Sequence, residues 1–443
     1  MPSEIGTTSV NTARVAVAGV CDFDGVLRGK HVAAEDLSNG DRIVRFSEAV
    51  LAWDCSDRVI PASFTKRPPS AFGDADLRIL SRTGRPVSNR RDLYLAEFAG
   101  DHESICPRGV LRKVLRRAAD HGYSCTAAFE FEFMLFKESA ETINNKPFDQ
   151  WAPLTLGPFG YSLTRAIANE ELFDEILALC ENARTPLSGL HFETGPGVIE
   201  ASLHHCDALD AADRAVVFKS MIKSWAQTKG MTASFMAKVS ENWPGQSGHI
   251  HISMSSDGNS AFYDSETRWN ISETMSQFIG GQLKYMTDFC VLVAPNVNSY
   301  KRLVAGFWAP ICPSWGIDNR SCAVRVIPGG SEAHHLEYRL SGADVNPYLA
   351  LACALGSGIL GIEEDADLAA PFVGDASEEN ERSLERLPQH LLEATSRFAR
   401  SQKAIDLFGE RFVEAFSCSR RWEWEAIQHR VTDFERERYF EII

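Results

Sequence analysis

Two glutamates stand inside an otherwise apolar run in the stretch AAFEFEFMLF, residues 127–136. An extended backbone repeats its side-chain direction every two residues, so a strand here would place the phenylalanines of the run on one face. Glu130 and Glu132 would then share the opposite face, where two like charges repel each other. This pattern indicates that a cation is bound between them.

Four more segments repeat this alternation of apolar and charged positions. Their polar members are His249, His251 and Ser253 in HIHIS, Arg325 in AVRVI, Glu337 and Arg339 in LEYRL, and Glu193 and Glu200 on either side of the Gly-Pro-Gly turn in HFETGPGVIEASL. Any one of these faces fits the solvated side of an antiparallel strand. Together they consist almost entirely of Glu, His and Arg, which bind metals and phosphates.

The inventory of glutamates with one histidine suits Mg²⁺ or Mn²⁺ better than zinc or copper. Arginines beside the cations indicate a polyanion, of which a nucleoside triphosphate is the commonest. The chain has neither a G-x-x-x-x-G-K-[ST] phosphate loop nor the protein-kinase signature set. Nucleotide binding must therefore come from another fold.

Composition excludes several other classes of function. The formal net charge of −15 and the lack of a basic patch argue against a nucleic-acid partner. No apolar run is long enough to cross a membrane. The N-terminus lacks a basic segment followed by an apolar core, so secretion is not expected. Eleven scattered cysteines without a C-x-x-C pair indicate reduced thiols, and hence a cytoplasmic protein without disulfides or a zinc site.

The elements that must position these residues can be read from periodicity and punctuation. Helical spacing predicts a helix that starts near Pro107 and stops near Gly122, and another over residues 209–229 that stops at Gly230. The segment 346–362 predicts a helix apolar nearly all round, which is normally buried. The acidic segment 364–385 predicts a loop. A change in the sequence pattern at residues 104–109 predicts a boundary between a small α+β unit and a larger domain.

Several motifs together resemble the glutamine synthetase family. FEFEF, ETGPGVIE, SGHIHIS, RLVAGFWAP, NRSCAVRV and LEYRLSGADVNPYLA occur in the order and spacing of that family, and the likeness covers most of the chain. The resemblance implies an α+β protein with an N-terminal β-grasp-like domain over residues 1–103. A catalytic domain over residues 104–443 follows, with a curved antiparallel sheet flanked by helices that forms a funnel open at both ends.

The resemblance also implies roles for individual residues. The ligands of one metal would be Glu132, Glu193 and Glu200, and those of the other Glu130, His249 and Glu337. Contacts with ATP phosphates would come from His251, Ser253 and Arg325, and contacts with glutamate and its γ-phosphate from Gly245, Arg302, Arg320 and Arg339. Asp54 matches the acid that helps to take a proton from the incoming amine in a neighbouring subunit, which implies a homo-oligomer, a dodecamer of two stacked hexameric rings.

In this family ATP first converts glutamate into γ-glutamyl phosphate, which an amine then attacks. Members that use ammonia carry a glutamate in RLVPGYEAP, and the matching segment here, RLVAGFWAP, has Trp308 at that position. This exchange removes an anionic contact for ammonium and adds an aromatic face for an alkyl chain or, through a cation–π contact of about 0.5–2 kcal/mol, a second ammonium. A packing role with compensation elsewhere is the alternative interpretation of Trp308.

Other departures concern the same region. Val198 replaces a glutamine, Pro244 replaces an asparagine, and His335 replaces an arginine near the phosphates. The adenylylation motif is absent, so control by adenylylation is not expected. The early segment CDFDGVLRGK (21–30) resembles the γ-glutamylpolyamine synthetase branch, although a tight hairpin at Gly25 explains it equally well.

The sequence therefore predicts an ATP-dependent ligase that joins the γ-carboxyl of glutamate to an organic amine. It leaves open whether that amine is a polyamine or a monoamine. A diamine site needs a carboxylate near the far ammonium, whereas a monoamine site would be apolar there, with Trp308 in its wall. Two alternatives remain: a glutamine synthetase that uses ammonia, and a non-catalytic structural or regulatory homologue.

Overall fold

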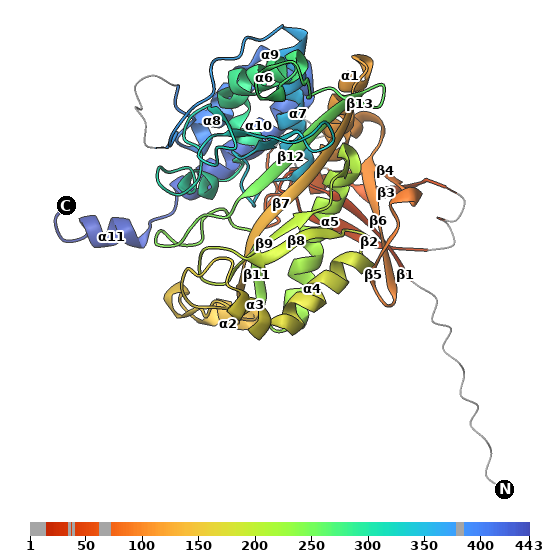
Figure 1. Ribbon diagram of the computed structural model, residues 1–443. Coiled ribbons are helices and arrows are strands. Elements are labelled where there is room, and N and C mark those ends of the chain that lie inside the picture. Colours follow the sequence, from red (N-terminus) through yellow and green to blue (C-terminus); the bar gives the residue numbers. More distant parts are fainter. Residues whose placement is uncertain (1–14, 34–36, 38–39, 62–71, 378–384) are drawn as a thin grey trace.

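The computed structural model describes residues 15–33, 37, 40–61, 72–377 and 385–443 (Figure 1). The first part of the chain forms a six-stranded sheet from β1 (Val15–Cys21), β2 (Leu27–Val32), β3 (Arg42–Ser47), β4 (Asp74–Ile79), β5 (Arg85–Ser88) and β6 (Arg91–Phe98). The order is β2-β1-β6-β4-β3, with β5 paired to β6 and with β1 and β6 parallel. A tight turn with Gly25 at a φ of 79° joins β1 to β2, so CDFDGVLRGK forms the hairpin that the sequence allowed.

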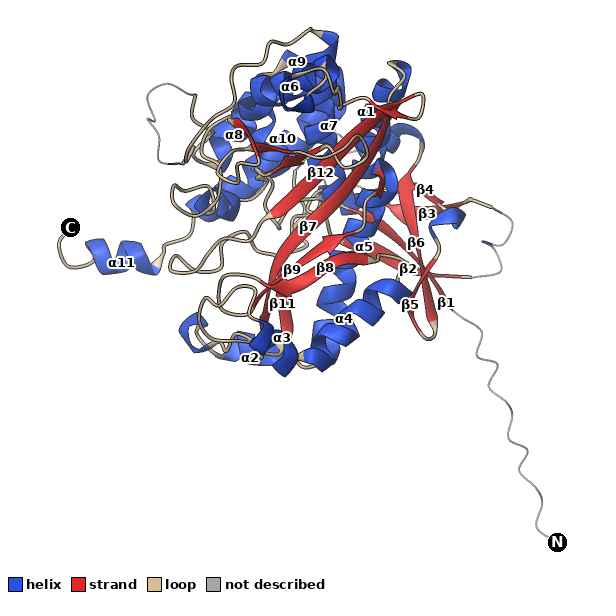
Figure 2. Ribbon diagram, in the orientation of Figure 1, coloured by secondary structure: helices blue, strands red, loops and turns tan. Residues whose placement is uncertain are grey.

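A second, larger sheet holds the charged faces. Its ten strands are β7 (Ser124–Phe136), β8 (Leu187–Phe192), β9 (Val198–Leu203), β10 (Cys206–Asp207), β11 (Thr232–Ser234), β12 (Gly248–Ser256), β13 (Asn259–Ser260), β14 (Trp315–Ile317), β15 (Val324–Ile327) and β16 (His335–Tyr338). The main order is β14-β15-β16-β12-β7-β9-β8, antiparallel except for the pair β14–β15. The long strands β7 and β12 run side by side through its middle (Figure 2).

Strand register brings the charged residues of this sheet together. His249 on β12 lies directly opposite Glu130 on β7, and Glu200 on β9 lies opposite Glu132. A shift of one residue would turn either set to the other face, so the apolar residues between them fix the register. The charged face is thus a consequence of how the apolar face is buried.

The apolar face of β7 packs against helix α5 (Ala208–Thr228). Phe131 and Phe133 are fully buried, and each ring centroid lies 6.1 Å from that of Phe218 on α5. The helix stops at Gly230, where φ is 66°, as its sequence predicts. This packing leaves the glutamates of β7 on the opposite, open side of the sheet.

Helix α7 (Pro347–Glu363) is the centre of the helical layer. Asn346 caps its start, accepting from the backbone N–H groups of residues 348 and 349, and the helix is buried from Pro347 to Gly361. Gly361 meets Gly281 of α6 (Glu273–Phe289) so closely that a Cβ on Gly281 would lie 2.5 Å from the Gly361 Cα. Near them lie α1 (Pro107–Asp120), α8 (Leu391–Arg400), α9 (Gln402–Phe408) and α10 (Glu410–Gln428) (Figure 1).

The remaining helices lie at the periphery. Those at the far end of the large sheet are α2 (Ala140–Asn145), α3 (Leu163–Ala168) and α4 (Glu170–Asn182). Helix α11 (Asp433–Tyr439) stands away from the body of the molecule (Figure 1). None of the helices in the described parts of the chain is long and apolar enough to span a bilayer.

Most of the predicted elements are confirmed. The three helices and the five strand segments lie where periodicity puts them, and the overall class is mixed α and β. Strand β16 ends at Tyr338, so Arg339 follows the strand that was expected to contain it. Before Pro107 the described residues form strands and 3-10 turns without an α-helix. Of the loop predicted at 364–385, residues 378–384 lie outside the described chain.

The boundary near residue 103 stays a prediction. One continuous cluster of buried apolar side chains extends from Ala16 on β1 through Phe131 to Phe416 on α10. The two sheets therefore share a core.

Candidate active site

The charged face of the large sheet lines a cavity of about 420 Å³, which we call the carboxylate cavity. Glu130 and Glu132 from β7, Glu200 from β9, His249 from β12 and Glu193 just beyond β8 all contribute to its wall. These side chains come from segments far apart in the sequence. The cavity therefore joins five of the six residues for which metal binding was expected, and the sixth, Glu337, lies directly behind His249.

Glu130, His249 and Glu337 form one compact group. Nδ1 of His249 lies 3.3 Å from Oε1 of Glu130 and 3.2 Å from Oε1 of Glu337, while its Nε2 is buried without a hydrogen-bond partner. Burial opposes ionisation of both acids, but His249 and His251 hold the pKa of Glu130 below its usual range. The pKa of Glu337 falls to about 2 because His249 and Arg339 outweigh its burial. Both carboxylates are anionic at neutral pH.

A second group contains Glu132, Glu193 and Glu200. Burial, followed by the charges of neighbouring glutamates, raises the pKa of Glu200 to about 9, and burial raises that of Glu132 to about 7. Nε2 of His191 lies 3.1 Å from Oε2 of Glu193 and 3.4 Å from Oε1 of Glu200. His191 was missed at the level of sequence, although it shares the alternating positions of Glu193 in HFETG.

The two groups fit a pair of divalent cations. Ligand atoms lie within 4.8 Å of one another in two sets, Glu130 with His251 and Glu337, and His191 with Glu193 and Glu200. These sets overlap the expected ones but bring in His251 and His191. Oxygen ligands with one nitrogen suit Mg²⁺ or Mn²⁺. The unpartnered Nε2 of His249 and the raised pKa values of Glu132 and Glu200 are the features that a cation would relieve.

Arginines line the side of the cavity toward Gly245. Arg302 is buried, and its Nη2 donates to three backbone carbonyls of residues 339–341, while Nη1 has no partner. A Cβ at Gly245 would lie 2.5 Å from Cγ of Arg302, so glycine is required for this approach. Arg339 and Arg320 line the cavity, and Nε of Arg339 donates to the Arg320 carbonyl at 3.0 Å. The free guanidinium nitrogen suits a carboxylate or a phosphate.

A neighbouring cavity of about 470 Å³ contains His251 and Ser253. It shares Glu130 with the carboxylate cavity, so the two are adjacent. His335 also lines it, and its Nε2 lies 3.1 Å from Nδ1 of His251. Arg325 lies just behind, with its Nη1 3.0 Å from Oε2 of Glu337. The basic groups expected at the phosphates of ATP are therefore close to the first group of acids.

Residues 104–439 match the model of the glutamine synthetase catalytic domain. The chain belongs to the glutamine synthetase family. It is 37% identical to type-1 glutamine synthetase 2 from Dictyostelium discoideum over 439 residues, which cover 97% of this chain and 84% of the relative. It is 34% identical to glutamate–isopropylamine ligase from a Pseudomonas species over 448 residues, 98% of this chain and 96% of the relative. A solved GmaS–ADP complex has a TM-score of 0.83 at 25% identity and covers 97% of each chain.

These similarities confirm the glutamine synthetase fold and the likeness to its amine-ligase branch. They leave the roles of single residues as predictions.

Trp308 stands at the mouth of the carboxylate cavity. It follows the 3-10 turn η8 (Val297–Lys301) and lines the cavity with Phe307, yet 71% of its surface is exposed. Its φ of 56° is in the left-handed region, which is strained for a bulky residue, and Gly306 before it has a φ of 81°. Strained backbone often occurs at binding sites, and here it presents an aromatic ring at the position for which the family resemblance implies a carboxylate in members that use ammonia.

Tyr161 is another aromatic residue that lines the carboxylate cavity, and it was missed at the level of sequence. Its ring stacks on that of His191 with centroids 4.3 Å apart, and its φ is 55°. Burial and the charge of Glu193 raise its pKa to about 12, so the phenol stays neutral and can donate a hydrogen bond. It lies in the irregular segment GPFGYS, where no periodicity marks it.

Asp54 is the one expected site residue that lies elsewhere among the described residues. It is absent from the described lining of the carboxylate cavity, and its Oδ2 accepts from Nε1 of Trp422 at 3.0 Å. Its Oδ1 accepts from the backbone N–H groups of Ser56 and Arg58. Burial opposes ionisation, but these donors lower the pKa of Asp54. Because Asp54 does not line the cavity of its own chain, its predicted role would be exercised in the cavity of a second copy.

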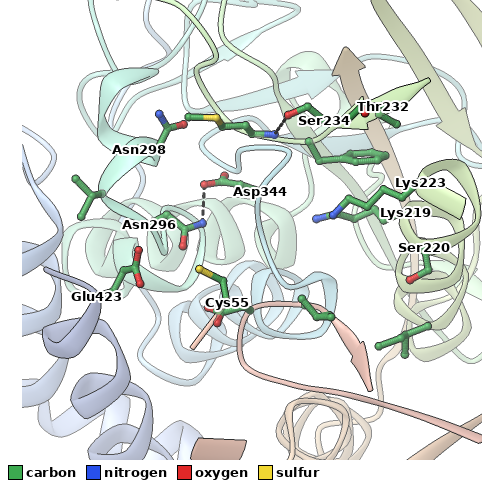
Figure 3. A pocket seen from close by; sticks show the side chains of 18 of the residues that line it. Cys55, Lys219, Ser220, Lys223, Thr232, Ser234, Asn296, Asn298, Asp344 and Glu423 are labelled. Atoms are coloured by element: carbon green, nitrogen blue, oxygen red, sulfur yellow. Dashed lines mark hydrogen bonds between the residues drawn. The ribbon is translucent and has the colours of Figure 1, made fainter. Parts of the chain in front are cut away.

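A larger cavity, of about 880 Å³, lies on the apolar side of the large sheet (Figure 3). Lys219 and Lys223 of α5 point into it side by side, and Nζ of Lys219 donates to the carbonyls of Ala343 and Val345 at 2.7 and 2.8 Å. Burial and the charge of Lys223 lower the pKa of Lys219 to about 7. Because the glutamates face the other way, this cavity is separate from the candidate active site. Lys219 fixes the segment between β16 and α7.

Proposed function

We propose that the protein is an ATP-dependent ligase that joins the γ-carboxyl of L-glutamate to an organic amine. The observation that carries this proposal is Trp308, an aromatic ring that lines, together with four glutamates and two arginines, the carboxylate cavity and is largely exposed. The similarity to a glutamate–isopropylamine ligase supports it. Ammonia needs no aromatic surface, whereas an alkyl chain gains by covering one.

The first step would transfer the γ-phosphoryl group of ATP to a γ-carboxylate oxygen of glutamate, giving ADP and an acyl phosphate. Glu130, His249 and Glu337 would hold one Mg²⁺ or Mn²⁺, and Glu132, Glu193 and Glu200 the other. Bound cations neutralise charge on the transferring group. His251, Ser253 and Arg325 would contact the ATP phosphates. Gly245, Arg302, Arg320 and Arg339 would orient glutamate, for which the unpartnered Nη1 of Arg302 offers a donor.

In the second step a bound alkylammonium first loses one proton, the free amine nitrogen then attacks the carbonyl carbon, and phosphate leaves as the nitrogen loses a second proton. An alkylammonium has a pKa near that of lysine, about 10.4, so a carboxylate must attract the cation and take the proton. Asp54 from a neighbouring copy is our candidate for this group. Its three hydrogen-bond donors keep it anionic, which favours binding of an ammonium over strong basicity.

This role implies a homo-oligomer, and we propose the dodecamer of two stacked hexameric rings that the family resemblance implies. Helix α11 and the residues after it support assembly, because Phe434, Phe440 and Ile442 are 64%, 88% and 83% exposed. Exposed apolar patches of this kind mark association surfaces. All eleven cysteines are free thiols, which favours a reducing compartment and hence the cytoplasm.

Glutamine synthesis from ammonia is the second candidate, and the similarity to a type-1 glutamine synthetase favours it. A non-catalytic homologue is the third. It is disfavoured because all six expected metal ligands are present in the sequence, and because His249 contacts Glu130 and Glu337 while ligand atoms of Glu193 and Glu200 lie within 4.8 Å of one another.

The test is turnover of ATP by the purified protein with Mg²⁺ and glutamate across ammonia, ethylamine, butylamine, benzylamine, putrescine and spermidine. Mass spectrometry would identify each γ-glutamyl product. We expect ADP release with organic amines and little with ammonia. Turnover with ammonia alone would replace the proposal by glutamine synthesis, and no turnover with any amine would favour the non-catalytic homologue.

A further inference from the structure

Another cavity, distinct from the three described above, opens beyond Trp308. It has a volume of about 470 Å³ and shares Trp308 and Arg320 with the carboxylate cavity. Three separate segments form its walls: the 3-10 turn η6 (Arg268–Asn270), the connection from β14 to β15, and residues 371–374. A substituent on the attacking amine that passes Trp308 would enter this space, which we call the outer cavity.

The described walls of the outer cavity are mainly apolar. Six of its ten described lining residues are apolar: Trp269, Trp308, Ile317, Pro371, Phe372 and Val373. A cavity of this size, lined by aromatic and aliphatic groups, suits an uncharged organic substituent.

The charged groups of the outer cavity do not favour a second cation. Among its described lining residues Asp318 is the one carboxylate, and Arg325 holds it through Nε at 2.9 Å and Nη2 at 2.5 Å. Arg320 is the other charged group, and it is cationic. An ammonium in this cavity would therefore face an arginine and a carboxylate that is already paired, and it would lose water without gaining a partner.

Hydrogen bonds hold the walls of the outer cavity in place. Nδ2 of Asn319 donates to the Gly374 carbonyl at 2.9 Å, and the backbone N–H of Phe372 donates to the Trp315 carbonyl at 2.8 Å. On the opposite wall the guanidinium of Arg268 lies 3.9 Å from the ring centroid of Trp269. A preformed apolar surface binds with little ordering cost.

We infer that the amine substrate is a primary monoamine whose uncharged, apolar substituent lies in the outer cavity, and that diamines and polyamines are poor substrates. This inference rests on the proposed function and specifies its amine. It also selects the apolar alternative at Trp308 over recognition of a second ammonium by its ring.

Butylamine and putrescine make the sharpest comparison, because they share a four-carbon chain and differ in one terminal ammonium. We expect kcat/KM for butylamine to exceed that for putrescine by about tenfold or more, since the cavity leaves the second charge unpaired. Equal or better use of putrescine would overturn the inference and leave the proposed ligase intact. Turnover with ammonia alone would remove both.

A pair of variants at Val373 tests where the substituent lies. Val373 is 89% exposed, so neither exchange should disturb folding. Val373→Asp adds a carboxylate to the outer cavity, and Val373→Asn adds a side chain of the same shape without charge. We expect Val373→Asp to move the butylamine-to-putrescine ratio toward putrescine by about tenfold relative to Val373→Asn. The same ratio in both variants would show that the substituent lies elsewhere and would overturn the inference.

Discussion

Glu130 and Glu132 are two residues apart on one strand, yet their surroundings shift their ionisation in opposite directions. Glu130 meets the imidazoles of His249 and His251, which outweigh its burial and lower its pKa. The backbone N–H of Ser247 donates to Oε2 of Glu132, but burial dominates and raises the pKa of Glu132 to about 7. Of the two expected cation sites, the one that contains Glu132 and Glu200 therefore holds the carboxyl groups that are harder to ionise without a cation.

The raised pKa values in this site affect the stability of the protein in the absence of metal. The pKa values of Glu132 and Glu200 are raised from 4.5 to about 7 and about 9, so the folded protein binds more protons than the unfolded chain between those values. Their favourable contribution to the free energy of unfolding is fully present below pH 4.5. It is lost as pH rises to about 9, at up to about 1.4 kcal/mol per pH unit for each group. In a chelator, we expect thermal unfolding of the Glu200→Gln variant to be less sensitive to pH than that of the wild type.

Adding Mg²⁺ should raise the unfolding temperature of the wild type and have a much smaller effect on Glu200→Gln. Glu441→Gln, at an exposed position outside the site, is the matched control and should respond as the wild type does. A Mg²⁺ response in Glu200→Gln equal to that of the wild type would contradict a cation site at this position. Differential scanning fluorimetry with and without the metal measures all three.

Trp308 is the residue whose substitution should change the choice of amine most. Trp308→Glu restores the carboxylate of the ammonia-using members, and 71% exposure of the native side chain means that the fold should tolerate it. We expect kcat/KM for butylamine to fall by about tenfold or more, and that for ammonia to rise, because apolar contact is exchanged for charge. Trp308→Phe keeps an aromatic face and should retain the preference for butylamine. Unchanged amine selectivity in Trp308→Glu would return Trp308 to a packing role.

At the scale of elements, the parts of the site predicted from sequence are those that periodicity determines. Alternation in β7 and β12 fixes which residues face the cavity, and burial of Phe131 and Phe133 fixes the register. Tyr161 and Trp269 could not be predicted in this way, because they lie in irregular segments and reach the site only through tertiary packing. Two walls of the outer cavity are likewise joined by hydrogen bonds that Phe372 makes with Trp315 and Asn319, and these bonds have no local signature.

Lys219 shows how a helix on the apolar side of the sheet supports the site on the other side. It fixes the carbonyls of Ala343 and Val345, just after the segment that carries Arg339. Its pKa is lowered from 10.5 to about 7, so between these values the folded state binds fewer protons than the unfolded chain. The unfavourable contribution of this buried lysine is fully present below about pH 7 and is relieved as pH rises toward 10.5.

The wild type should therefore gain stability relative to Lys219→Met as pH rises from about 7 to 10, by up to about 1.4 kcal/mol per pH unit. Urea unfolding across this pH range measures the difference. Lys229→Met, at the exposed end of the same helix, is the control. A difference between wild type and Lys219→Met that does not change with pH would show that Lys219 remains charged in the folded protein.

At the scale of the whole molecule, the question is how Asp54 meets the carboxylate cavity. In one chain its Oδ2 accepts from Nε1 of Trp422 of α10, and it is not among the described residues that line the cavity. A head-to-tail contact that closes into a ring would bring Asp54 of each subunit to the next subunit's cavity, because such an interface joins two different surfaces. Each complete site would then contain Asp54 from one copy and Glu337 from another.

Mixed assemblies test this arrangement directly. Pure Asp54→Asn and pure Glu337→Gln proteins should each lose activity, by about a hundredfold or more if Asp54 serves in proton transfer. In a randomly mixed assembly of equal amounts, a site is complete when a Asp54→Asn subunit supplies the cavity and a Glu337→Gln subunit supplies Asp54. That combination occurs at about a quarter of the sites in a ring of heterologous contacts, so about a quarter of wild-type activity should return.

The two variants should be co-expressed with different affinity tags and purified through both, and mass photometry should establish the size of the assembly. The same two proteins mixed after separate purification, without exchange of subunits, are the control and should stay inactive. Recovery in the mixed assembly alone would assign Asp54 to the neighbouring site. Full loss of activity in the mixed assembly would mean that Asp54 acts, if at all, within its own chain, and the proton acceptor would then have to be sought among Tyr161, Glu193 and the other groups at the mouth of the cavity.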